Sequence, residues 1–494
     1  MVKINKRRFH MKKGLAVLLS VAMCASLTAC GGGNDGSSGA SSSGGSTASG
    51  SASSASSSAS TAGSTSEEEI TLQWVGAGWQ ANNKADKVIA KWNELHPNVK
   101  VNYVELASVV DEEYMKNLDI MISGGEQVDI TYLGIDDAFN RIMNGGALPV
   151  TEYAEAAGDD YDEMYGTLAK TQLSYNGELY GVPFANNTYK VFYNKTMMEE
   201  KGIEIPETWS YEEFTEIAKQ VNDPDNGVYG CVFPSTWSDL CYAPAEVAGW
   251  QSVVKDADGN LVPNFEDEVF KKNMQWVYDL AETDKVSPSY ATIKAESLNR
   301  RQALAQGDTA MIIDGPFTLV WLQTYMFDDP GEGQLPFEIG VADLPYMTEE
   351  AKEVSFNTIV GAFYVPKTSA YPEWAYEFEK FLCNECYVES ANYMPTYVDA
   401  DWEAATESFR EYTDSNGEVH EDIYPKEVAE GAVSTPYESH VAKWGKDPSL
   451  AAYYNLMYTL FTEQYSVYLG GEMSLDDWCS MMQELAAAEI ANIQ

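Results

Sequence analysis

The stretch EITLQWVGAGWQANNKADKVIAKWNELHPNVKVNYVEL, from Glu69 to Leu106, decides the fold class of this chain. Its first eight residues alternate apolar and polar side chains, the pattern of a strand that is buried on one face. Apolar residues then recur at helical spacing, as at Val88 and Trp92, until Pro97 ends the helix. A second strand follows from Val99 to Leu106. The stretch predicts a strand–helix–strand unit, which is normally parallel with a right-handed crossover.

Strands and helices keep alternating beyond this unit. Val128 to Gly134 is the third expected strand, and Asn176-Gly177 is a strong turn signal for a hairpin. Ser210, with Glu213 three residues later, predicts a capping box at the start of a helix. The alternation predicts an α/β fold with mainly parallel sheets. The 428 residues from 67 to 494 are enough for two lobes rather than one.

The first 66 residues have a different character. Residues 1–29 combine a positive stretch with an apolar run that is shorter than the roughly 20 residues of a membrane span, which predicts an export signal. Leu27 to Cys30 resembles the lipobox of bacterial lipoproteins, and this resemblance implies cleavage before Cys30 and lipid on its sulfur. The alternative is an ordinary secretory signal with an incidental cysteine. Residues 30–66 would then be the lipidated cysteine and a Gly/Ser-rich flexible tether, with a reach of roughly 30–35 Å.

The rest of the chain is strongly acidic. Without the six positive charges of the signal, it has 25 basic and 76 acidic side chains, a formal charge of −51. This charge argues against a nucleic-acid partner and against electrostatic docking on anionic lipid. We therefore expect contact with the membrane only through the lipid anchor.

Five cysteines remain once the signal and Cys30 are set aside. Cys383 and Cys386 form a lone CxxC in a helical pattern without a neighbouring histidine, and the four histidines have no metal-ligand spacing. We therefore predict neither a metal nor a cofactor. The sequence leaves open whether Cys231 and Cys241 form a disulfide.

Several stretches are specific for one family when they are taken together. In chain order they are VDITYLG, NGELYGVPFANNTYKVFYNKTMMEEKGIEIPETWSYEEF, ALAQGDTAMIIDGPF, VGAFYVPKTSAYPEWAYEFEKFL and GGEMSLDDWCSMMQEL. Through them the chain resembles the extracellular solute-binding lipoproteins of ABC importers, in the maltose-binding-protein-like family 1 group. The resemblance covers nearly all of Glu69 to Glu489. It implies a two-lobed periplasmic-binding-protein-like fold, in which hinge crossovers join the lobes and a ligand binds in the cleft between them.

The resemblance also implies where the chain passes between the lobes. We expect crossings near Phe184–Lys190, near Asn357–Ala362 and after Tyr393–Tyr397. The expected N-terminal lobe is 67–185 plus 360–396, and the expected C-terminal lobe is 186–359 plus 397–494.

Ligands of open α/β lobes lie beyond the carboxyl ends of the strands. The residues expected at such ends, or in aromatic loop-like stretches beside them, are Trp79, Gln80, Gly134, Asn187, Tyr189, Trp237, Asp239, Asp314, Phe317, Tyr437 and Trp444. Aromatic rings stack on the apolar face of a pyranose, while Asp, Asn and Gln bind its hydroxyls, so we expect a mono- or oligosaccharide. Asn187 falls where family members carry a ligand-contacting polar group.

Each candidate also has a structural interpretation. An aromatic residue can belong to a lobe core, and Asp314 could serve only to fix the turn at Gly315-Pro316. We assign Trp74 and Trp92 to the core outright.

We therefore predict a monomeric sugar-binding lipoprotein, not an enzyme, that is anchored outside the cytoplasm and delivers its cargo to the permease subunits of an importer. One alternative is a cationic ligand such as a polyamine or peptide, held by Asp136, Asp239 and Asp314. Another is a lipid-anchored glycosidase, whose paired carboxylates, roughly 5–10 Å apart, could be hidden among the 76 acids. A receptor that feeds a sensor protein would have the same sequence features.

Overall fold

The computed structural model describes residues 69–78, 84–107, 112–234, 238–328, 331, 333–390, 394–434, 439–442 and 450–493. For some residues inside these ranges, among them Asp136, Asp239 and 357–360, only the backbone is described. The predicted signal, Cys30 and the tether lie outside the described residues and stay predictions.

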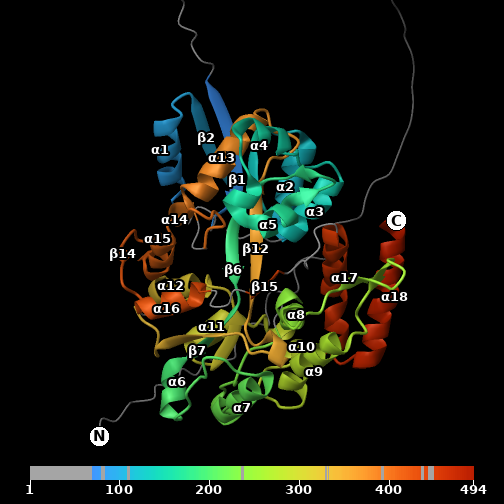
Figure 1. Cartoon of the computed structure of the whole chain (residues 1–494). Helices are drawn as coiled ribbons and strands as arrows, with labels where there is room; N and C mark the ends of the chain where they lie inside the picture. The colour runs from blue at the N-terminus through green and yellow to red at the C-terminus, as the bar shows by residue number, and fades with distance from the viewer. Residues whose placement is uncertain are drawn as a thin grey trace, which may run out of the picture. The chain divides into compact units, whose positions relative to one another are not determined.

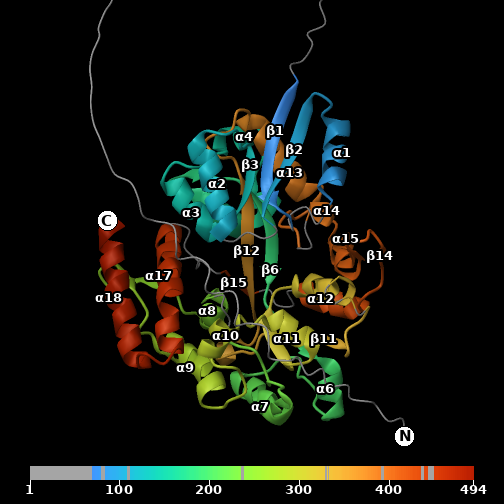
Figure 2. The same ribbon diagram turned by 180° about the vertical axis from the view of Figure 1, so that it is seen from behind.

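The larger sheet has six strands and contains the strand–helix–strand unit (Figures 1 and 2). The strand order is β15-β12-β3-β1-β2, and β6 pairs with β12. The strands are β1 (Ile70–Ala77), β2 (Val99–Ala107), β3 (Ile130–Gly134), β6 (Val182–Thr188), β12 (Val354–Tyr364) and β15 (Ser439–Ala442). β1 is parallel to both β2 and β3, as the sequence predicts.

The smaller sheet has three strands, in the order β10-β7-β11. They are β7 (Lys190–Asn194), β10 (Met311–Asp314) and β11 (Ile339–Asp343), and both neighbours of β7 are antiparallel to it. The prediction of mainly parallel sheets is therefore wrong here. The reason is that β7 continues directly from β6 and so runs away from the first sheet, whereas β10 and β11 run back and end opposite Lys190.

Two tryptophans of the opening stretch lie in the core. Trp74 of β1 and Trp92 of α1 (Ala85–Leu95) are almost completely buried. Phe378 of α13 (Pro372–Asn384) packs edge-on against both, with ring centroids 5.6 Å and 5.0 Å away. Burial of such large rings dominates core energetics, so these contacts fix α1 and α13 on the sheet.

The hairpin turn and the helix cap that the sequence predicts are both found in the structure. Asn176 and Gly177 both have positive φ and connect β4 (Ser174–Tyr175) to β5 (Glu178–Leu179) in a tight hairpin. Ser210 caps α7 (Tyr211–Val221), and the Glu213 side chain closes the capping box. The chain ends in two helices, α17 (Ala451–Leu469) and α18 (Leu475–Ile493), which lie side by side (Figure 1).

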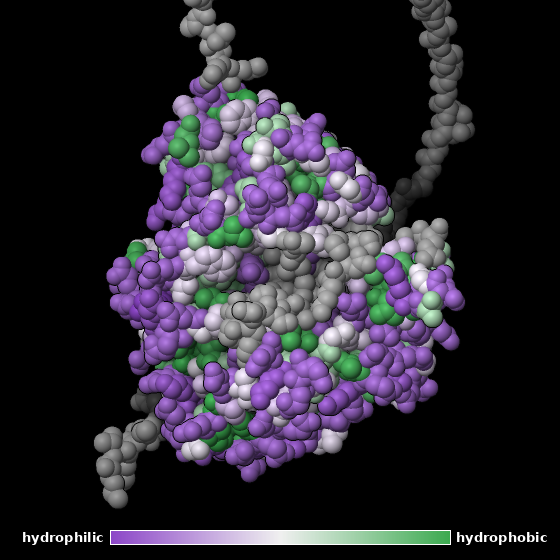
Figure 3. Space-filling view, in the orientation of Figure 1, coloured by the Kyte–Doolittle hydropathy of each residue, from purple (hydrophilic) through white to green (hydrophobic). Residues whose placement is uncertain are grey.

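The described surface is mostly polar. Figure 3 shows a largely hydrophilic face on which hydrophobic residues form small separate groups. No described helix has both the length and the apolar character needed to cross a membrane. Cys231 and Cys241, like Cys383, Cys386 and Cys479, are buried, and no disulfide joins these described residues.

Candidate functional site

The chain passes from one sheet to the other at Tyr189. Tyr189 alone separates β6, which pairs with β12, from β7, which pairs with β10 and β11. In register, Asn187 lies opposite Thr358 in the first sheet, and Lys190 lies opposite Asp314 in the second. The carboxyl end of β10 therefore meets the start of β7 at this junction.

A third segment reaches the same place. The backbone N–H of Asn186 donates to the carbonyl oxygen of Met394 over 2.9 Å, and the Thr396 hydroxyl donates to the Pro183 carbonyl over 2.5 Å. β6, β12 and the segment around Met394 thus lie side by side. These are the three segments that we expect to cross between the lobes, and the exact lobe boundaries remain a prediction.

A buried ion cluster closes the end of β10. Asp314 is fully buried, and its two carboxylate oxygens accept hydrogen bonds from both Arg300 and Arg301, at 2.7 to 3.2 Å. The backbone N–H of Gly315 adds a further bond of 2.8 Å. The arginines start α11 (Arg300–Gln306), where the Asn299 side chain caps the helix. A bidentate contact from each guanidinium makes this cluster strongly directional.

The cluster fixes the charge state of Asp314. Burial by itself would raise the pKa of the carboxyl, but the guanidinium groups of Arg300 and Arg301 outweigh it and hold the pKa below its usual value. Asp314 is therefore an anion at neutral pH, and it is bound by the guanidinium groups of Arg300 and Arg301.

Aromatic rings surround this cluster. The Arg301 guanidinium lies over the rings of Phe317 and Trp321, 4.8 Å and 5.5 Å from their centroids. Tyr189 stacks on Phe356 of β12, with the centroids 5.3 Å apart. Stacked rings and a cation over an aromatic face give the junction a rigid frame.

Polar groups without partners line the same junction. Asn187 is 3% exposed, and a Cβ added at Gly315 would lie only 2.5 Å from its side-chain nitrogen, so Gly315 lets the amide approach the turn before α12 (Thr318–Phe327). Among the described residues, no hydrogen-bond partner is found for the side-chain oxygens of Asn186, Asn187 or Thr318. Leaving a buried polar atom without a hydrogen bond costs about 1–3 kcal/mol.

The structure brings together four of the predicted site residues: Asn187, Tyr189, Asp314 and Phe317. Gly134 ends β3, opposite Gly361 of β12. Asp239 lies in α8 (Ser238–Val247), described by backbone only. The other five candidates lie outside the described residues: Trp79, Gln80, Trp237, Tyr437 and Trp444. Contact of any of these residues with a ligand remains a prediction.

Sequence reasoning missed Arg300 and Arg301. A signal was present, because they are two of only four arginines between residues 31 and 494. Their common target, Asp314, lies 14 and 13 residues further along the chain.

One described group could hold a cation. Asp414, Glu418 and His420 bring ligand atoms within 4.8 Å of one another, although the sequence spacing of the histidines predicts no metal site. Asp414 already accepts the backbone N–H groups of Asn416 and Glu418, which is the ordinary bonding of the turn between β13 (Tyr412–Thr413) and β14 (Val419–His420). We assign no metal to it.

Two sheets joined through adjacent crossing segments define a two-lobed ligand-binding fold. The chain belongs to the family described as bacterial extracellular solute-binding protein, which matches residues 76–385. This is a family of binding proteins rather than enzymes, and both the predicted family and the predicted fold class are confirmed.

Individual relatives are more distant. The chain is 26% identical over 263 residues to an uncharacterized lipoprotein in the oleD 5' region of Streptomyces antibioticus. The aligned region covers 49% of this chain and 53% of that protein. It is 23% identical over 280 residues to the maltotriose-binding protein of Pyrococcus abyssi, which covers 53% and 54%. These matches span about half the length of the curated relatives.

A solved structure matches over more of the chain. An ABC substrate-binding protein from Listeria monocytogenes, in complex with cycloalternan, superposes with a TM-score of 0.67 at 17% identity. The match covers 86% of this chain and 100% of that one. At this identity the likeness establishes the fold.

Proposed function

We propose that this chain is the substrate-binding lipoprotein of an ABC importer, and that it captures a mono- or oligosaccharide by closing its lobes. The observation that carries the proposal is the set of buried oxygens without described partners, on Asn186, Asn187 and Thr318, at the junction of the crossing segments. A sugar hydroxyl can donate a hydrogen bond to one oxygen and accept from a neighbouring group, as these atoms require.

The names of similar proteins point to the same ligand class. One curated relative binds maltotriose, and a solved structure of the same fold holds cycloalternan, and both ligands are carbohydrates. The predicted aromatic platforms, Trp79, Tyr189, Trp237 and Trp444, would supply the stacking surfaces that a pyranose needs.

Capture would follow from the arrangement of the crossing segments. A ligand that contacts both lobes gains those contacts only in the closed state, so it shifts the population toward closure. The closed, loaded protein would then dock on permease subunits in the membrane.

The cargo would be released chemically unchanged. A glycosidase needs a carboxylic acid that can donate a proton at neutral pH, together with a second carboxylate nearby. Asp314 cannot serve as that acid, because two guanidinium groups keep it ionised.

The same cluster argues against a cationic cargo. Asp314 is one of the three carboxylates of the alternative cation site, and both of its oxygens are bound by Arg300 and Arg301. A polyamine approaching this junction would meet two arginine side chains.

Lipid on Cys30 would hold the protein at the outer surface of the cell membrane. The lipobox supports this, as does the similarity to a Streptomyces protein named a lipoprotein. The long polar tether would let the folded part reach a permease while it stays anchored. We expect the protein to act as a monomer.

The test is a binding screen of the chain without its signal, using thermal shift followed by calorimetry. The ligands are maltotriose, cycloalternan and other oligosaccharides, with spermidine and a basic peptide as controls. A sugar present at a hundred times its Kd should stabilise the fold by about 2.7 kcal/mol. Stabilisation by spermidine alone, or breakdown products from an oligosaccharide on chromatography, would refute the proposal.

A further inference from the structure

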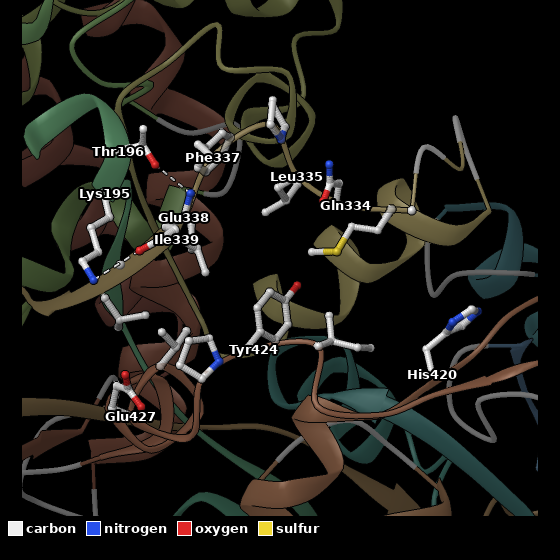
Figure 4. Close-up of a pocket in the computed structure, with 18 of the residues that line it drawn as sticks. Lys195, Thr196, Gln334, Leu335, Phe337, Glu338, Ile339, His420, Tyr424 and Glu427 are labelled. Carbon is white, nitrogen blue, oxygen red and sulfur yellow. Dashed lines mark hydrogen bonds and ion pairs between the residues drawn. The ribbon is translucent and has the colours of Figure 1, made fainter. Parts of the chain in front are cut away.

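A cavity lies beside β11, an edge strand of the smaller sheet, and the residues that line it do not include Tyr189. Its volume is about 890 Å³, and it opens between the segment 333–341 and the segment 419–428 (Figure 4). We call it the β11-edge cavity. Its size is within the range of roughly 300–1,000 Å³ that is usual for binding pockets.

The cavity borders an unpaired sheet edge. Among the described strands, β11 pairs only with β7. The Lys195 N–H donates to the Glu338 carbonyl, so Glu338 and, two residues on, Gly340 direct their backbone groups toward β7. The backbone N–H and C=O groups of Ile339 and Val341 therefore point away from β7. No hydrogen-bond partner for these groups is found among the described residues.

Side chains from both faces of the sheet line this one cavity. Tyr193 lies across Gly340, because a Cβ added there would come within 2.2 Å of the tyrosine ring. Ile339 and Val341 point to the other face, where they pack with Phe192. The cavity is therefore bordered by the edge strand itself, at Ile339, Gly340 and Val341.

The opposite wall carries several apolar and aromatic side chains and is held in place by contacts with α12. The Tyr424 hydroxyl donates to the Leu319 carbonyl over 2.7 Å, and His420 stacks on Phe327 with the centroids 3.9 Å apart. Val419 is 58% exposed at this wall. The wall offers apolar contact to whatever lies against β11.

The rim of the cavity is acidic. Three glutamates line it, Glu338, Glu421 and Glu427, and all are exposed. Lys195, the lysine that lines the cavity, already pairs with Glu338 and Glu199 (Figure 4 shows the first pair). The surplus of negative charge favours an occupant with basic side chains.

Natural proteins rarely leave a sheet edge open, because unpaired backbone groups attract another strand. We propose that the β11-edge cavity binds an extended, basic segment of another protein, which pairs as a fourth strand with Ile339 and Val341. Alternate apolar side chains of the segment would lie against the 419–428 wall, and basic ones would meet Glu421 and Glu427. Main-chain bonds of this kind give affinity, and the alternate side chains give specificity. The proposal does not depend on the sugar site.

The probe is a fluorescein-labelled hexapeptide amide of alternating lysine and valine, measured by fluorescence anisotropy. Its counterpart carries N-methyl groups on alternate backbone amides, which keeps the charge but removes the strand donors. We expect the N-methylated peptide to bind at least tenfold more weakly. Equal binding of the two peptides would overturn the proposal, because it would show a general attraction to an acidic protein that depends on charge alone. No binding of either peptide would overturn it as well.

Charge-reversal variants locate the site. Glu427→Lys should weaken binding several-fold, whereas Glu430→Lys should not, since Glu430 is exposed on the same helix, α16 (Lys426–Val433), but does not line the cavity. Hydrogen exchange should show new protection at the amides of Ile339 and Val341. Equal effects of the two variants would contradict the proposal, as would protection elsewhere, or dimerisation of the free protein through this edge.

Discussion

The ring of Tyr189 lies almost parallel to the ring of Phe356, with 11° between the planes and 5.3 Å between the centroids. Tyr189 is the single residue between β6 and β7, and Phe356 belongs to β12. The stack therefore connects two of the crossing segments at the point where the chain changes sheets.

Removal of this stack should show energetic coupling between the two crossing segments. We expect the variants Tyr189→Leu and Phe356→Leu to be coupled by about 0.5–1.5 kcal/mol in a double-mutant cycle, because each loses the same ring–ring contact. Urea unfolding of the two single variants and the double variant measures it. Additivity within about 0.3 kcal/mol would show that the stack contributes nothing beyond burial.

Asp314→Asn should destabilise the fold by about 3–5 kcal/mol, because Arg300 and Arg301 would remain buried without their anion. Urea unfolding at pH 7 measures the loss. The matched control is Asp308→Asn, an exposed aspartate in the connection from α11 to β10, which should change stability by less than about 0.5 kcal/mol. Equal stability of the two variants would contradict the structural role of the cluster.

The contribution of Asp314 should also depend on pH with a defined sign. Although burial opposes ionisation, the arginines hold the folded-state pKa below the unfolded value of about 3.9. The stabilisation is therefore fully present above that value and is lost as the pH falls below it toward the folded pKa. The difference in free energy of unfolding between wild type and Asp314→Asn should be constant from pH 7 to about 5 and should shrink below about 4.

Glu379 should have the opposite pH dependence. It lies fully buried on α13, neither carboxylate oxygen has a partner among the described residues, and burial raises its pKa well above the usual value. The folded state keeps the proton that the unfolded state releases above about pH 4.3, so this group lowers stability as the pH rises. Glu379→Met should be more stable than wild type at pH 8, by roughly 1–3 kcal/mol, and the gap should narrow toward pH 4.

Thermal melts across this pH range check the Glu379 prediction. The control is Glu377→Gln, at a more exposed position of the same helix. It should follow the wild-type pH dependence. A gap between Glu379→Met and wild type that is independent of pH would show that the carboxyl is not neutral in the folded protein.

Asn187→Ala should weaken sugar binding about tenfold or more, because it removes the buried amide at the junction. Trp79→Ala and Trp237→Ala should also weaken binding while leaving the melting temperature of the ligand-free protein nearly unchanged. Calorimetry and thermal melts of the three variants are the measurements. A sharp drop in melting temperature with intact affinity would make the two tryptophans core residues.

Cys30→Ser should release the protein into the soluble fraction, because it removes the sulfur that carries the lipid. Fractionation of cells followed by immunoblotting measures the distribution. Unchanged membrane retention would count against lipidation.

Much of the fold follows from local pattern. The alternation from Ile70, the helical stripe through Val88 and Trp92, and the capping box at Ser210 each report on a few neighbouring residues, and each is found where it is predicted. The direction of the strands in the smaller sheet does not follow from local pattern. Period-two alternation is the same in parallel and antiparallel strands, so only the path of the chain through Tyr189 decides it.

The site was predicted less completely, for a related reason. Asn187, Asp314 and Phe317 could be proposed because each follows or lies in a recognisable strand. Arg300 and Arg301 stand at the start of a helix, and their sequence position does not indicate that both side chains turn back to one carboxylate. Such convergence depends on tertiary placement, which local pattern does not encode.

The one-residue joint at Tyr189 has a consequence for how this chain can evolve. Val191 and Phe192 point to opposite faces of the smaller sheet and into different hydrophobic clusters. Adding or deleting a single residue between Thr188 and Lys190 would exchange those two faces along the whole of β7. Insertions should therefore be tolerated in surface turns of this chain but selected against at this position, whatever the cargo.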